Sequence, residues 1–149
     1  MLLLKGSLAN FRHSLKDYLE RGSELIKRYP PGTFLWGFKR VDARVKSGID
    51  VFIYVTRNEY NEGGIALYGT LKEVAEASVR YWPEGEWAYL APIAVKATAP
   101  GVLDHPDDPS KWRVVTRAEL RELGVTVLPG IQNISQNIAE KIVARLVKV

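Results

Sequence analysis

Two indoles close together on a turn are the side chains of this sequence best suited to binding chemistry. Trp82 and Trp87 lie five residues apart in the segment YWPEGEW. Pro83 fixes its own φ and Gly85 tolerates conformations that other residues avoid, so a loop is predicted here, with Trp87 opening the next strand. Indoles on a loop can wall a slot for a flat or cationic ligand, through stacking and cation–π attraction. The alternative is that both rings cap a hydrophobic core.

A third indole favours a ligand-binding slot over core packing. Trp36 follows the break Tyr29-Pro30-Pro31-Gly32, and we expect it to lie in an irregular segment. Flanking cations could anchor a phosphate backbone beside the three rings. The candidates are Lys39 and Arg40 after Trp36, Arg80 before Trp82, and Lys5.

Catalytic chemistry has little support in the sequence. There is no Gly-rich phosphate loop, no Ser/His/Asp arrangement and no cysteine nucleophile. The two histidines, His13 and His105, lack metal-ligand spacing, and His13 is expected on the surface of a helix. Asp104, Asp107 and Asp108 occupy a Pro-rich loop that is expected to be solvated. We therefore expect a non-catalytic protein without a metal ion or cofactor.

Composition sets the broad class. The 149 residues are 46% hydrophobic and 26% charged, which is typical of one globular domain spanning 1–149. No apolar run approaches the roughly 18 residues that cross a bilayer, so no membrane partner is expected. The opening MLLLK is predicted to be a strand rather than a secretory signal, which favours a cytoplasmic location.

Charge and residue usage give weaker indications. A net charge of +4 and a pI of about 9.3 permit a polyanionic partner. Abundant Lys, Arg and Glu without cysteine indicate an archaeal or heat-loving source.

Periodicity and turn residues predict strands interleaved with helices. In the first half we expect a strand over 2–5, a helix over 9–29 broken at Gly22, a helical turn over 41–45 and a strand over 51–56. A hairpin loop over 58–64 leads to a returning strand over 65–74 with a bulge at Gly69. A long strand then covers 87–96, where Pro92 implies an edge or a bulge.

The C-terminal third is predicted to be a loop and two helices. The loop covers 100–112, and Thr116 with Glu119 forms a capping box for a short helix that ends at Gly124. Ile134, Ile138, Ile142 and Leu146 recur at helical spacing behind a cap at Asn133 or Ser135. Hairpin spacing of the strands favours an α+β fold with a mostly antiparallel curved sheet or small barrel flanked by helices.

The order of motifs resembles the EVE domain, a member of the PUA-like superfamily. The resemblance covers roughly 2–96: strand, helix, Trp-Gly, Val-Lys-x-Gly-x-Asp, two strands, then Trp-Pro-x-Gly-x-Trp-x-Tyr. EVE domains are similar to YTH domains, which recognise N6-methyladenine by taking the extruded base into an aromatic cage. The chain departs from EVE proteins in lacking their Asn-Trp pair early in the first helix and in the greater length of that helix.

The resemblance implies site residues and a function. Trp36, Trp82 and Trp87 stand in the order and spacing of the YTH cage, and Asn10, with Ser7 as a weaker match, stands where YTH domains contact the base edge. The implied function is binding of a modified, flipped base, in methylated DNA or in RNA. EVE and YTH-like modules also serve as specificity domains of McrBC-type restriction proteins, where a motor domain belongs to the same full-length chain.

Two alternatives remain open from the sequence. One is a PUA-like RNA-binding protein of tRNA or rRNA metabolism, which reads shape and phosphate without a methyl cage. The other is an ASCH-like small-molecule enzyme that uses the same cleft.

Overall fold

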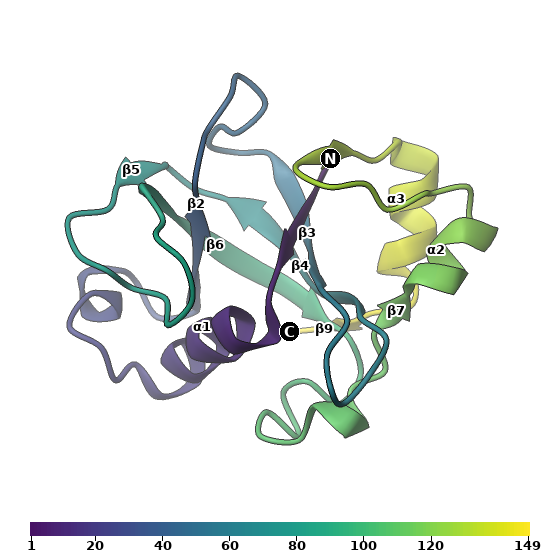
Figure 1. The fold of residues 1–149 in the computed structure, drawn as a ribbon, viewed down its shortest axis with the longest axis horizontal. Helices are drawn as coiled ribbons and strands as arrows, with labels where there is room; N and C mark the ends of the chain where they lie inside the picture. The colour runs from purple at the N-terminus through teal and green to yellow at the C-terminus, as the bar shows by residue number, and fades with distance from the viewer.

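A mixed nine-stranded sheet forms the centre of the computed structural model, which describes all 149 residues (Figure 1). The strands run in the order β2-β6-β4-β3-β1-β8, with β5 and β9 paired to β6 and β7 paired to β4. Their bounds are β1 Leu2–Gly6, β2 Thr33–Phe38, β3 Asp50–Val55, β4 Gly64–Leu71, β5 Ala75–Glu76, β6 Tyr89–Thr98, β7 Val115–Thr116, β8 Gln132–Asn133 and β9 Val147–Lys148. Only β1 and β3 pair in parallel. The sheet is open, so the α+β class and the mostly antiparallel sheet are confirmed, whereas a small barrel is not.

The central hairpin forms where β-branched and aromatic residues predict it. β3 and β4 pair antiparallel around the loop at 58–63, and the β4–β6 register shifts between Tyr68 and Gly69, as expected for a bulge. The glycine is required by close packing, because a Cβ at position 69 would lie 2.5 Å from the carbonyl oxygen of Ala94.

The first helix is shorter than predicted. α1 spans Leu8–Glu20, Ser7 caps its N-terminus, and Arg21 ends it in the left-handed conformation with φ 53°. The Asp17 carboxylate accepts hydrogen bonds from the backbone N–H and the hydroxyl of Ser23, which pulls the chain away from the helix axis. The apolar residues beyond this point form a separate 3-10 turn over Ile26–Arg28.

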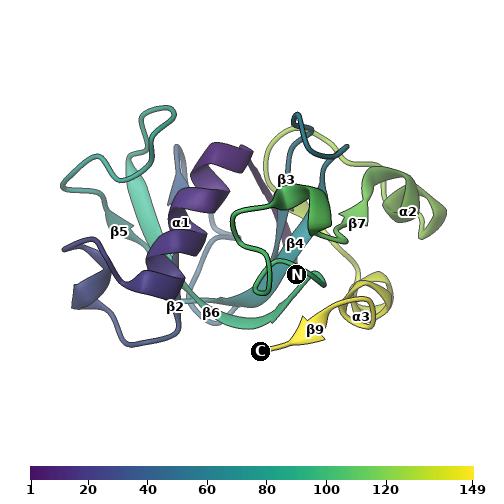
Figure 2. The ribbon, with the colours of Figure 1, turned by 90° about the horizontal axis from the view of Figure 1, so that it is seen from below.

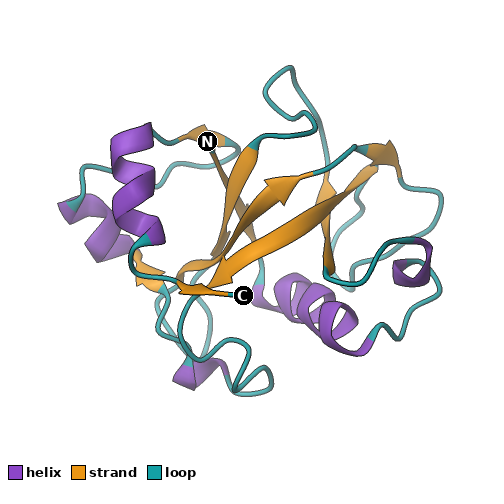
Figure 3. Cartoon of the chain, turned by 180° about the vertical axis from the view of Figure 1, so that it is seen from behind, coloured by secondary structure: helices purple, strands orange, loops and turns teal.

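Two apolar clusters lie on opposite faces of the sheet. Leu2 and Leu4 of β1 belong to the larger cluster with Phe11 of α1, whereas Leu3 belongs to the smaller one. This alternation follows from the two-residue period of a strand. The smaller cluster is covered by α2, Arg117–Glu122, and α3, Gln136–Val143, which gather at the end of the molecule away from α1 (Figures 2 and 3).

The C-terminal predictions are largely confirmed. Thr116 and Glu119 form the capping box of α2, and the helical spacing of Ile138 and Ile142 is that of α3. Ser135 is the N-cap of α3 but makes no side-chain bond there, and Asn133 belongs to β8. No helix combines the length and the apolar character that a bilayer crossing requires.

Three local predictions are wrong. Trp36 lies in a regular strand, because the segment after Gly32 pairs with β6 along its whole length. The helical turn over 41–45 is absent, since the Asp42 carboxylate accepts from the backbone N–H of Arg44 in a turn. Pro92 is in the interior of the sheet, in register with Leu35 at the point where β6 changes partner from β4 to β5.

Candidate functional site

The three indoles expected to converge do so, but they form a packed cluster rather than an open slot. Trp36 comes from β2, whereas Trp82 and Trp87 come from the loop 77–88, where Trp87 precedes β6 rather than opening it. The Trp82 ring is nearly perpendicular to both others, with centroid separations of 4.6 Å to Trp36 and 4.9 Å to Trp87. Trp36 and Trp82 are each only 2% exposed, and Trp87 is partly exposed. Edge-to-face contact therefore fills the space beside Trp82, and only Trp87 offers an accessible ring.

A buried chain of hydrogen bonds fixes Trp82. Its indole Nε1–H donates to the Ser14 hydroxyl at 2.8 Å, and that hydroxyl donates to the carbonyl oxygen of Leu35 at 2.6 Å. Ser14 is fully buried. The loop, α1 and the outer edge of β2 are thereby joined through one side chain.

Asn10 holds the loop at its tip. Its amide donates to the carbonyl oxygen of Glu84 at 3.2 Å and accepts from the Glu84 N–H at 3.1 Å, and it is only 1% exposed. The same carbonyl accepts from Trp87 Nε1 at 2.7 Å. Ser7 accepts from the backbone N–H of Asn10 as the cap of α1. A contact of Asn10 or Ser7 with a base edge stays a prediction, and it requires these bonds to open.

A cavity of about 640 Å³ lies between the indoles and a group of cations. Its volume is within the range of small-molecule sites. It is bounded by the segment after β2 and by residues of the segment that leads into β8, which lie at the end of the sheet near the N-terminus (Figure 1). Its lining comprises Leu4, Lys5, Trp36, Gly37, Phe38, Lys39, Arg40, Val41, Asp42, Arg44, Trp87, Gly130 and Ile131.

Three of the four expected phosphate-binding residues line this cavity. Lys5, Lys39 and Arg40 do so, whereas Arg80 donates to the carbonyl oxygens of Trp82 and Pro83 and steadies the loop. A fourth cation at the cavity, Arg44, escaped the sequence analysis because the segment was interpreted as a helical turn. Its proximity in sequence to Trp36 and Arg40 was the available signal.

The electrostatics of the cavity favour an anion. The Lys39 ammonium lies 5.1 Å from the centroid of the Trp87 ring, within range of a cation–π interaction. Burial, together with the charge of Arg44, lowers the pKa of Lys5 to about 8. A negatively charged ligand would relieve the repulsion between these cations.

A smaller cavity of about 280 Å³ lies on another side of Trp87 and is lined by Arg80, Tyr81 and Glu86. The Tyr81 hydroxyl donates to the Asp17 carboxylate at 2.8 Å, and burial followed by this carboxylate raises the pKa of Tyr81. The ring of His13 packs edge-on against Tyr81 at 4.7 Å, so this histidine is only partly on the surface. These contacts anchor the loop to α1.

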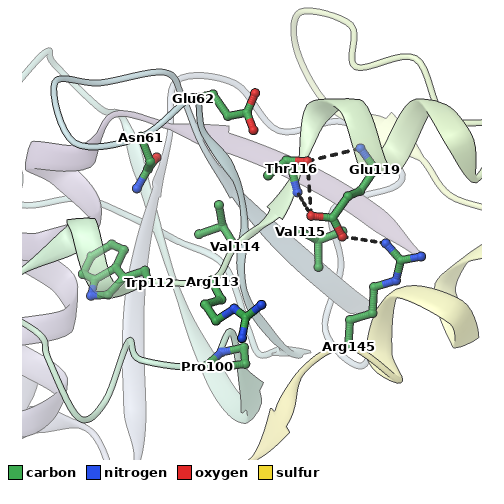
Figure 4. Close-up of a pocket in the computed structure, with 10 residues that line it drawn as sticks. All are labelled: Asn61, Glu62, Pro100, Trp112, Arg113, Val114, Val115, Thr116, Glu119 and Arg145. Carbon is green, nitrogen blue, oxygen red and sulfur yellow. Dashed lines mark hydrogen bonds and ion pairs between the residues drawn. The ribbon is translucent and has the colours of Figure 1, made fainter.

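The other large cavity, of about 620 Å³, lies near β7 and α2 (Figure 4). Of its two acidic residues, Glu62 and Glu119, the second is already paired, since its carboxylate contacts Arg145 at 2.6 Å and accepts from the Thr116 hydroxyl. Trp112 is 5% exposed and packs against Phe11 as part of the larger apolar cluster. No group of three or more His, Cys, Asp or Glu side chains in the molecule is placed to hold a metal ion.

Comparison with known proteins gives information about the fold alone. No family model and no curated protein matches the chain. A solved structure of a hypothetical protein from Leishmania major is similar with a TM-score of 0.57 and 15% sequence identity, over 96% of this chain and 91% of that one. At this identity the likeness shows a shared fold across nearly the whole chain.

Proposed function

We propose that this domain binds nucleic acid without catalysis and takes one unstacked base into the 640 Å³ cavity beside Trp87. One observation carries the proposal: a partly exposed indole and four cationic side chains line the same cavity. Aromatic faces bind bases of any sequence, and cations at the rim bind the backbone that leads to them.

Stacking of a base on Trp87 can offset the free energy needed to unstack that base from its neighbours in the nucleic acid. Unstacking costs a few kcal/mol, and each base stacked on an aromatic ring regains about 1–3 kcal/mol. In the free protein the Lys39 ammonium lies over the Trp87 ring. When a base stacks on this ring, the lysine side chain can move aside and bind a phosphate. The buried Trp36 and Trp82 hold Trp87 in position rather than contacting the base on both faces.

We extend the proposal to a modified base, N6-methyladenine being the first candidate. An apolar lining from Leu4, Phe38 and Trp87 accepts a methylated amino group at less desolvation cost than an unmodified one. We further propose that the chain is an EVE domain, which its order of motifs resembles, and that its target is methylated DNA, as in a methyl-directed restriction protein, rather than RNA.

The second candidate is a domain that binds RNA through shape and phosphate without preferring a methyl group. The observation in its favour is the edge-to-face packing of Trp36 and Trp82, which leaves no preformed slot closed on three sides.

Titration with matched oligonucleotides tests both candidates. Single-stranded and duplex DNA and RNA would carry either one N6-methyladenine or adenine at the same position. We expect about fourfold or greater preference for the methylated strand, since burying one methyl group contributes about 0.8 kcal/mol. Equal affinity for both would discard the methyl preference and leave the second candidate. Failure to bind any strand would overturn the proposed function.

Trp87 is the residue to change first. Trp87→Ala should weaken oligonucleotide binding about tenfold to a hundredfold by removing the stacking face, while Trp87→Phe keeps most of it. Tyr60→Ala, at an exposed aromatic residue of the β3–β4 loop, is the matched control and should bind as the unchanged protein does. Circular dichroism would establish that each variant folds. Full affinity in Trp87→Ala would remove the cavity from the binding site.

A further inference from the structure

We propose that Lys5 and Arg44 form a subsite of this cavity for a single phosphate, belonging to the nucleotide whose base stacks on Trp87. The inference rests on the proposed function and narrows its ligand class to a nucleoside 5′- or 3′-phosphate unit. It assigns to the inner cations a role distinct from that of Lys39 and Arg40 at the exposed rim.

Lys5 is a partly buried cation without an anionic partner. Its ammonium donates to the carbonyl oxygen of Gly130 at 2.6 Å and to Oε1 of Gln132 at 3.1 Å, both neutral acceptors. None of the four ion pairs in the structure involves it. An ammonium group has three donors, so one remains for a ligand.

Arg44 lines the same cavity and has donors to spare. It contacts Asp42 through Nε and Nη2, and Nη1 donates to the carbonyl oxygen of Ile131 at 3.2 Å. A guanidinium has five N–H donors, and these contacts leave one on each of its terminal nitrogens. Lys5 and Arg44 therefore present unused donors to one space.

The backbone around this subsite is fixed by the same two side chains. Gly130 and Ile131 line the cavity, and their carbonyl oxygens are the acceptors of Lys5 and Arg44. Gln132 strengthens the arrangement by accepting from Leu128 N–H and donating to the carbonyl oxygen of Thr126. The cations are thus held in place before a ligand arrives, which lowers the ordering cost of binding.

The charge of the cavity lining also favours a phosphate over an uncharged ligand. Four cationic and one anionic side chain line it, and burial, followed by the charge of Arg44, lowers the pKa of Lys5 to about 8. A phosphate dianion would draw the proton back onto Lys5, so binding should be coupled to proton uptake above pH 8.

The test compares adenosine with adenosine 5′-monophosphate by calorimetry on the full chain. We expect the monophosphate to bind at least about tenfold more tightly, because a charge-assisted hydrogen bond contributes about 1.5–3 kcal/mol. Lys5→Met should remove most of this advantage and should affect the binding of adenosine, which carries no phosphate, much less. The advantage should also fall by up to about tenfold per pH unit between pH 8 and 9.5, where phosphate stays dianionic.

Gln132→Ala separates charge from loop anchoring. This variant loosens the same segment but keeps the Lys5 ammonium, so it should retain the preference for the monophosphate. Equal loss in Gln132→Ala and Lys5→Met would overturn the subsite, as would equal binding of both ligands by the unchanged protein. If adenosine and oligonucleotides bind while the phosphate adds nothing, the subsite alone fails. If no ligand of any kind binds, the proposed function fails with it.

Discussion

Asn10 shows how a polar side chain can support the proposed site without facing its cavity. Its amide pairs with both backbone groups of Glu84, in the geometry by which two strands pair, and the Glu84 carbonyl also holds the Trp87 indole. Asn10 is therefore a positioning residue in the free protein. Its neighbour Ser7 contributes by capping the helix that carries it.

Asn10→Ala should loosen the loop and lower binding through Trp87. The backbone groups of Glu84 lose their partner, and we expect the free energy of unfolding to fall by about 1–3 kcal/mol. Acrylamide quenching of tryptophan fluorescence should increase, and oligonucleotide affinity should fall.

Asn137→Ala, on the exposed face of α3, is the matched control and should change neither quantity. Unaltered quenching and affinity in Asn10→Ala would show that the loop does not depend on this amide.

At the scale of elements, one hydroxyl links three pieces of structure. Ser14 on α1 satisfies the Leu35 carbonyl at the outer edge of β2 and accepts from Trp82 of the loop. An edge strand with unpaired backbone groups is open to further pairing, and here α1 blocks that edge. The loop that carries Trp87 is consequently attached to the core rather than to the surface.

Ser14→Ala should be among the most destabilising small substitutions in the chain. It leaves a buried carbonyl and a buried indole N–H without partners, each at a cost of about 1–3 kcal/mol, so we expect a loss of at least about 2 kcal/mol. Urea unfolding measures it. Ser47→Ala, in an exposed turn, provides the comparison, and a loss no larger than in that variant would contradict the linking role.

At the scale of the whole molecule, one cavity brings several cationic side chains together. The net charge of +4 is modest, but four cations meet at the cavity near the N-terminus. α2 and α3 cover the smaller apolar cluster, on the face of the sheet opposite to α1. Of the chain between these two helices, Gly130 and Ile131 line the cavity.

The dependence of oligonucleotide affinity on salt concentration should show whether these cations bind phosphates. Each phosphate neutralised on a single strand contributes about −0.7 to the slope of log K against log salt concentration. Engagement of all four cavity cations predicts a slope of about −3, and Arg40→Ala should make it shallower by about 0.7. Lys141→Ala, on α3, should leave the slope unchanged. A slope near zero in the unchanged protein would exclude backbone binding at this cavity.

Parts of the fold that depend on neighbouring residues could be predicted from the amino-acid sequence alone. The β3–β4 hairpin, the bulge at Gly69 and the capping box at Thr116 follow from side-chain types within a few positions, and all three are present. We also expected the three indoles to converge, because the order of motifs resembles that of EVE and YTH domains.

Which of these indoles is accessible, and which residues line the cavity beside them, became known from the three-dimensional fold. Burial of Trp36 and Trp82, the pairing of Asn10 with Glu84 and the meeting of Lys5 with Arg44 each depend on contacts between segments tens of residues apart. Local sequence carries no record of such contacts, because the same tryptophan or lysine fits a surface loop and a packed core equally well until the rest of the chain is folded around it.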